Sequence, residues 1–342
     1  MFGTTRFILA VSVVVFHLTN YSSVIGFYSV QGFFILSGYL MTSVMRNKYK
    51  YNITGITVFI IKRIVRIYPA YWFSILISLI VITLDPITSQ MCHPFLTFPN
   101  DFSQWISNIF LFGKTSSSKL IPPGWSLLTE FFYYILISLY LTKYNTLISL
   151  WFLFSIFTTF YLNFYTDDNN WIEYLYFDPL SSSLSFSIGA LIFVIAKKIN
   201  ILYNIFQGTY SVIILNMIII TFFFISTTLF NPHCNLKEFK VSYYINMTLI
   251  ALIILILSNT TTTNLIFKKT DSFLGELSYP LYLLHWPIYS AIQSLFWRLS
   301  LPNYDIVILL VVILSIIIIS VFSIIPFERY IKFKFETKFF EK

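Results

Sequence analysis

Charged side chains are scarce in this sequence. Asp, Glu, Lys and Arg make up 11% of the 342 residues, whereas hydrophobic residues make up 57% and aromatic residues 20%. A soluble domain is normally about a quarter charged, so this chain has too few charges to cover a globule in water. The composition therefore excludes an ordinary soluble domain and predicts that lipid is the main solvent of the protein.

The sequence also lacks a polar block long enough to fold separately, and its first apolar run lacks a signal-peptide cleavage site. Apolar segments recur from end to end, so we predict one transmembrane domain over residues 1–342. The first run follows Arg6 directly and contains His17. Without small residues at a cleavage position, this run is predicted to stay in place as the first span.

Cysteine is nearly absent, with only Cys92 and Cys234. Both fall in loops that we predict on the non-cytoplasmic side, where an oxidising compartment would allow one disulfide between them. Two unrelated thiols are the equal alternative. The neighbouring His93 and His233 complete no zinc-binding spacing, so the sequence predicts no metal site.

Long apolar runs are abundant. A spanning helix needs about twenty mostly apolar residues, so the runs predict an all-α, polytopic membrane helical bundle with about ten transmembrane helices and both termini in the cytoplasm. The stretch Trp105–Phe112 is too short to cross and is predicted to be interfacial or re-entrant. The predicted spans are Arg6–Gly26, Phe27–Met45, Val58–Leu84, Gly124–Leu141, Leu147–Tyr165, Tyr174–Ala196, Tyr210–Phe230, Val241–Leu257, Phe273–Trp297 and Ile306–Ile325.

The net charge of +8 is explained by orientation in the membrane rather than by nucleic-acid binding. Threading the chain from a cytoplasmic start puts every basic cluster in the cytoplasm and puts the acidic loop residues outside. The acidic residues are Asp85, Asp101, Asp167, Asp168 and Glu173; the basic clusters are Arg46, Lys48 and Lys50, then Lys62, Arg63 and Arg66, then Lys197 and Lys198, then Lys268 and Lys269, and the tail from Arg329 to Lys342.

Ionisable groups within the spans are functional candidates, because an unpaired charge in hydrocarbon costs several kcal/mol. Arg6 and His17 are eleven positions apart in the first span. This spacing is close to three helical turns, so the two residues share a face and His17 lies deeper in the membrane. The alternative is a buried histidine bonded to a neighbouring carbonyl, with Arg6 as an anchor of the helix end.

Two further spans carry charged candidates. Arg63 and Arg66 are three residues apart, so their guanidinium groups can converge on one anionic ligand such as a phosphate. Ordinary cytoplasmic anchoring explains them equally well. Glu130, in the segment Gly124–Glu130, can orient His17 or pair with an arginine, although an interhelical salt bridge is the structural alternative.

His285 lies beside Pro287, whose ring frees a backbone carbonyl in the helix. A hydrogen bond from His285 to that carbonyl is slightly favoured over a catalytic role. In the second span, Gly38 permits close helix packing and Ser37 can hydrogen-bond across it, which predicts a packing seam.

These segments, in this order, resemble the acyltransferase-3 family of integral membrane acyltransferases. The resemblance covers essentially the whole chain and departs from the family at two positions. Gln31 stands where many members carry Asp, and Tyr133 where many carry Phe, and both are expected to tune the choice of acceptor. The matching segments are Arg6 with His17, Phe33–Gly38, Arg63–Trp72, Trp125–Glu130 and Leu274–Pro287.

The resemblance implies transfer of an acyl group, usually acetyl, from cytoplasmic acyl-CoA to a hydroxyl of a cell-envelope saccharide such as O-antigen or exopolysaccharide. It implies a multi-pass protein of the bacterial inner membrane, with no tightly bound cofactor and with acetyl-CoA as co-substrate. The implied partners are acyl-CoA, a lipid-linked or surface saccharide and membrane lipids, but not nucleic acid. We expect no fused hydrolase-like domain, only a short basic cytoplasmic tail at 328–342.

Carried over residue by residue, the resemblance implies three groups of site residues. The catalytic residues are His17 and Glu130; Arg6, Arg63 and Arg66 bind acyl-CoA; and Ser37, Trp125, Ser126, Tyr279 and His285 line the substrate cavity.

A multi-pass transporter or flippase for a polar or lipid-linked small molecule is the main alternative function. Such proteins usually have pseudo-symmetric halves with Gly- or Pro-interrupted helices in matching places. The sequence has no such internal repeat.

Overall fold

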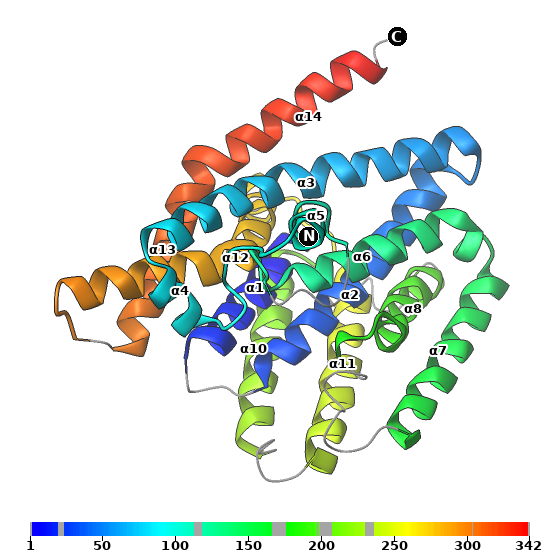
Figure 1. Cartoon of the computed structure of the whole chain (residues 1–342). Coiled ribbons are helices and arrows are strands. Elements are labelled where there is room, and N and C mark those ends of the chain that lie inside the picture. Colours follow the sequence, from blue (N-terminus) through cyan, green and yellow to red (C-terminus); the bar gives the residue numbers. More distant parts are fainter. Residues whose placement is uncertain are drawn as a thin grey trace. The chain divides into compact units, whose positions relative to one another are not determined.

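The protein is all-helical in a computed structural model, in which no strand occurs in the described residues (Figure 1). The structure describes residues 2–19, 24–112, 118–165, 176–196, 198, 207–229, 236–302 and 304–340. The prediction of an all-α fold is therefore confirmed.

The helices are α1 (Gly3–Leu18), α2 (Ile25–Val44), α3 (Ile53–Leu84), α4 (Pro86–Cys92), α5 (Phe102–Phe110), α6 (Gly124–Leu136), α7 (Asn145–Tyr165), α8 (Pro179–Ala196), α10 (Thr209–Leu229), α11 (Leu236–Asn259), α12 (Leu265–Arg298), α13 (Asp305–Ile319) and α14 (Ile325–Phe340). Short π-helical segments follow α2, α6 and α13, at Met45–Tyr49, Ile137–Leu141 and Ser320–Ile324.

Each of the ten predicted spans overlaps a helix, which confirms the polytopic helical bundle. Within the described ranges, seven helical segments are long and apolar enough to cross a membrane. That both termini lie in the cytoplasm stays a prediction. The seven segments are Ile53–Leu84, Gly124–Leu141, Asn145–Tyr165, Pro179–Ala196, Thr209–Leu229, Lys237–Asn259 and Asp305–Phe335.

The predicted end of the first span is wrong. The first span does not run from Arg6 to Gly26, because α1 ends at Leu18 and Gly26 belongs to α2. Thr19, the first residue after α1, has a hydroxyl that competes for backbone hydrogen bonds and so disfavours continuation of the helix. At the other end, the basic tail predicted at 328–342 is helical as far as Phe340.

The chain forms two compact units. Unit 1 comprises Met1–Phe16, Ser22–Ile60 and Thr129–Gly275, and unit 2 comprises His17–Tyr21, Ile61–Leu128 and Glu276–Lys342. Four of the five divisions fall within α1, α3, α6 and α12, so the units are interleaved along the sequence. A single transmembrane domain over residues 1–342 stays a prediction.

In unit 1, two glycines bring α2 and α8 into backbone contact. A Cβ atom on Gly38 would lie 2.2 Å from the carbonyl oxygen of Phe186, and one on Gly189 would lie 2.0 Å from that of Ile35. No side chain fits at such distances, so both positions require glycine. The packing seam predicted at Gly38 is confirmed, and its partner is α8.

The first turn of α1 is held by Asp271, a buried residue of α12 that also belongs to unit 1. Its carboxylate accepts hydrogen bonds from the backbone amides of Gly3, at 3.1 Å, and Thr4, at 2.8 Å. The first amides of a helix have no intrahelical partners and carry partial positive charge, so a carboxylate stabilises them. Asp271 therefore anchors the helix that carries Arg6.

In unit 2, the short helix α5 is attached to α3. With nine residues, α5 is too short to cross a bilayer, which confirms that Trp105–Phe112 is not a span. Its last carbonyls lack helical partners and accept hydrogen bonds from aromatic side chains instead. These bonds run from Tyr71 to Asn108 at 2.5 Å, from Trp72 to Ile109 at 3.0 Å and from Tyr68 to Phe110 at 3.0 Å.

Candidate functional site

Three rings of unit 2 meet at the end of α1. The imidazole of His17 stacks on that of His285, with ring centroids 5.1 Å apart and planes 11° apart. The indole of Trp286 lies 5.1 Å from the His17 ring. Because His285 and Trp286 are consecutive in α12, one turn of that helix presents both rings to His17. The structure thus brings together two predicted site residues from opposite ends of the chain.

His285 combines a structural bond with an unused nitrogen. Its Nδ1 lies 2.9 Å from the carbonyl oxygen of Tyr282. A carbonyl only accepts, so Nδ1 carries the proton, and Nε2 of the neutral ring presents a lone pair. This Nε2 atom is buried and has no hydrogen-bond partner among the described residues. His285 therefore has a free acceptor in addition to its structural bond.

The predicted hydrogen bond from His285 to a backbone carbonyl is confirmed, but the carbonyl differs from the expected one. Pro287 frees the carbonyl of Leu283, four residues before it. His285 bonds instead to Tyr282, three residues before itself, which a helical side chain reaches directly. The proline is therefore not the reason for this bond.

His93, which follows α4, belongs to the same cluster in unit 2. Its ring lies edge-to-face with Trp286, with centroids 4.7 Å apart and planes at 69°. Burial, together with the positive charge of Lys119, lowers the pKa of His93 to about 4, so the ring is neutral at physiological pH. The sequence pointed to His93 only as a neighbour of Cys92, because no spacing along the chain reveals its contact with Trp286.

Among the described residues, no group of three or more His, Cys, Asp or Glu side chains is arranged to hold a metal ion.

Two further predicted cavity residues attach other helices of unit 2 to α12. The Ser126 hydroxyl lies 2.7 Å from the Tyr282 hydroxyl, and the Tyr279 hydroxyl donates to the carbonyl of Ile67 at 3.0 Å. Tyr279, Tyr282 and Trp286 are spaced by three and four residues, so they share one face of α12. This face therefore connects the start of α6 and the middle of α3 to the ring cluster. Trp125, beside Ser126, is half-buried.

Arg63 and Arg66 lie one turn apart on α3, so the predicted shared face is confirmed. Arg63 is half-buried and Arg66 is exposed. Arg66 also interacts electrostatically with Glu328 of α14 in the same unit. A ligand for this pair stays a prediction.

Unit 1 holds the other predicted residues. Glu130 of α6 accepts hydrogen bonds from the hydroxyls of Ser37 on α2 and Tyr134 on α6. Its partners in the described part of unit 1 are thus hydroxyl groups, not the cation that an interhelical salt bridge needs. The pairing of Glu130 with His17, which belongs to unit 2, stays a prediction. Arg6 is half-buried on α1, and this helix is continuous to Leu18, so the predicted spacing from Arg6 to His17 holds.

The proposed disulfide involves one described cysteine. Cys92 is the last residue of α4, and burial raises the pKa of its thiol to about 12. Cys234 and His233 lie outside the described residues, as do Asp167, Asp168, Glu173 and Lys197, so the bridge stays a prediction.

A comparison with known families identifies the chain. A family model described as an acyltransferase domain, that of acyltransferase-3, matches residues 4–325 and so includes every predicted site residue from Arg6 to His285. No curated protein and no solved structure matches. Because the family match spans nearly the whole chain and coincides with its apolar helices, the protein belongs to the acyltransferase-3 family and is a multi-pass membrane acyltransferase.

Proposed function

We propose that this protein is an O-acyltransferase that moves an acyl group, in the first instance acetyl, from cytoplasmic acyl-CoA to a hydroxyl of a cell-envelope saccharide such as O-antigen or exopolysaccharide. The observation that carries the proposal is the stack of His17 on His285 beside Trp286. Imidazole is the side chain best suited to general acid–base chemistry at neutral pH. The proposal includes the bacterial inner membrane as location, with both termini in the cytoplasm.

In the proposed reaction, His17 accepts the proton of the saccharide hydroxyl while that oxygen attacks the thioester carbonyl. The carbon–sulfur bond of acyl-CoA breaks, an ester bond to the saccharide forms, and the coenzyme A thiolate takes up a proton. In the two-step version, His17 first carries the acyl group and then releases it to the hydroxyl. The stacked ring of His285 limits rotation of the His17 imidazole in either version.

Arg63 and Arg66 are proposed to bind the phosphates of the donor. Arg63→Ala and Arg66→Ala should each raise the KM for acyl-CoA about 10- to 100-fold with little change in kcat, because a charge-assisted hydrogen bond contributes about 1.5–3 kcal/mol. Lysine at either position should restore part of the loss, since it keeps the charge but not the bidentate geometry. Steady-state kinetics at varied acyl-CoA measures the effect.

Arg329→Ala is the matched control for donor binding. Arg329 is exposed on α14 and forms an ion pair with Glu276 at 2.7 Å. If this variant raised the KM as much as Arg63→Ala does, general positive charge rather than a defined site would attract the donor.

The overall proposal is tested with purified protein, radiolabelled acetyl-CoA and cell-envelope saccharide. We expect label to appear in the saccharide as a base-labile ester, together with stoichiometric free coenzyme A. A transporter or flippase would leave the thioester intact, and that outcome would contradict the proposal.

A further inference from the structure

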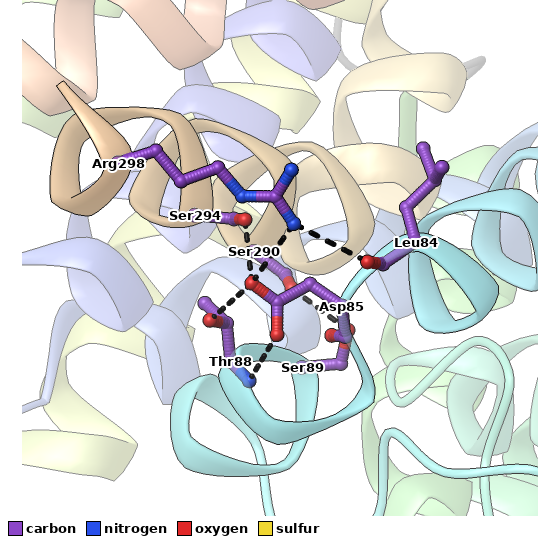
Figure 2. A network of polar contacts seen from close by, with 7 residues as sticks. All are labelled: Leu84, Asp85, Thr88, Ser89, Ser290, Ser294 and Arg298. Carbon is purple, nitrogen blue, oxygen red and sulfur yellow. Dashed lines mark hydrogen bonds and ion pairs between the residues drawn. The ribbon is translucent and has the colours of Figure 1, made fainter.

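The short helix α4 packs against the C-terminal half of α12 in a regular antiparallel register, all within unit 2 (Figure 2). Asp85 accepts a hydrogen bond from the hydroxyl of Ser294 at 2.6 Å. One turn further along α4, the hydroxyl of Ser89 lies 3.0 Å from that of Ser290. From the first contact to the second, the residue number rises by four on α4 and falls by four on α12. The contacts therefore lie on one face of each helix.

The next step of this register is the pair of His93 and Trp286, four residues beyond Ser89 and four before Ser290. We refer to the contacts of Asp85 with Ser294, Ser89 with Ser290, and His93 with Trp286 as the α4–α12 ladder. The ladder joins a polar contact at one end to the ring cluster of the candidate site at the other.

Asp85 fixes the polar end of the ladder. It caps the first turn of α4, where its carboxylate accepts from the backbone amide of Thr88 at 3.0 Å. The guanidinium of Arg298 lies 3.8 Å from the carboxylate and donates to the carbonyl of Leu84 at 3.4 Å. The hydrogen bonds from Ser294 and Thr88, with the charge of Arg298, lower the pKa of Asp85, so it is ionised at neutral pH. Figure 2 shows these groups converging on the junction between α3 and α4.

At the other end of the ladder, Trp286 touches both histidines of the candidate site. Its indole lies 5.1 Å from the ring of His17 and 5.7 Å from that of His285. An edge-to-face ring pair has a preferred geometry, so the ring of His93 restricts how the indole can turn. The backbone amide of Phe95 donates to Nδ1 of His93 at 3.3 Å and so restrains this ring in turn.

We infer that the α4–α12 ladder is a positioning device for acyl transfer, in which His93 is a positioning residue that holds the Trp286 indole and, through it, the imidazole of His17. The inference rests on the proposed function, in which His17 carries the chemistry. His93 acts by the shape of its ring, because that ring packs edge-to-face against the indole of Trp286. A small displacement of a reacting ring can lower a rate about 100-fold, so the device affects kcat rather than substrate binding.

The kinetic test compares His93→Ala with His93→Phe. The alanine variant should lower kcat about 10- to 100-fold with the KM for acyl-CoA unchanged. The phenylalanine variant keeps an aromatic edge against the indole and should retain kcat within about 3-fold of wild type. Asp85→Ala, which releases the far end of the ladder, should lower kcat in the same direction but less. Thr83→Ala is the control, since the exposed Thr83 hydroxyl bonds within its own helix to Leu79 at 2.8 Å.

Two kinetic results would overturn the inference. Wild-type kcat in His93→Ala would show that the ring is dispensable. Equal inactivity of the alanine and phenylalanine variants would show that the imidazole nitrogens, rather than the ring shape, are needed. In a double-mutant cycle, adding His93→Ala to Trp286→Ala should cause no further loss, because His93 acts through Trp286.

A second measurement separates this inference from the proposed function. Diethyl pyrocarbonate modifies accessible histidines, and mass spectrometry reports the rate at His17. We expect His93→Ala to change this rate severalfold and His93→Phe to leave it at the wild-type value. A wild-type protein that transfers no acyl group would refute the proposed function alone, whereas an unchanged rate at His17 in His93→Ala would refute the ladder alone.

Discussion

Replacing His17 with alanine is expected to abolish acyl transfer while the protein remains inserted and folded. General acid–base catalysis by a positioned side chain contributes about 10²- to 10⁴-fold, so the loss should be of that size or larger if His17 also carries the acyl group. The measurement is kcat with labelled acetyl-CoA, at equal amounts of protein in the membrane fraction. Undiminished acylation by this variant would refute His17 as the chemical centre.

Two matched variants separate chemistry from packing at this position. His17→Phe keeps a ring to stack on His285 but has no nitrogen, so it should be as inactive as the alanine variant. His285→Phe also keeps the stack but removes the buried Nε2 acceptor. If His285→Phe lost all activity while His17→Phe kept it, the catalytic base would be His285 rather than His17.

The second large effect is expected for the stability of unit 1 in Gly38→Ala. The added Cβ would lie 2.2 Å from the carbonyl oxygen of Phe186, which is backbone and cannot rotate away. Because α2 and α8 must separate, the variant should lose about 3 kcal/mol or more, at the upper end of overpacking effects. The direction of the change in stability is informative, because a glycine-to-alanine substitution inside a helix otherwise stabilises a protein by about 0.5–1 kcal/mol. Thermal unfolding in detergent measures the change.

Gly32→Ala is the control on the same helix. A Cβ atom there would meet the methyl groups of Leu9, at 3.1 Å, and that of Ile250, at 3.4 Å, and these lie at the ends of flexible side chains. The variant should be neutral or slightly stabilised. Equal destabilisation by the two substitutions would contradict a specific backbone contact at Gly38.

The amino-acid sequence by itself determined the class of protein. In lipid every backbone polar group must be satisfied internally, so a run of about twenty apolar residues reports a helix without reference to the rest of the chain. The same local logic predicted that Trp105–Phe112 does not cross, that Arg63 and Arg66 share a face, and that Gly38 allows a close contact. It placed the end of the first span wrongly, because α1 ends at Leu18, where the polar Thr19 that follows disfavours continuation of the helix.

Only the tertiary structure decided which side chains meet. The stack of His17 on His285 depends on the register between two helices from opposite ends of the chain, which no spacing along the sequence encodes. The contact of His93 with Trp286 depends on α4, a seven-residue helix too short to leave a hydropathy signal. The contact of Glu130 with Ser37 was likewise hidden, because Ser37 lies on α2 and Glu130 on α6, whereas Tyr134 lies one helical turn after Glu130 on the same helix. Hydropathy is a local property, whereas contacts between rings and hydroxyls are fixed by how helices pack.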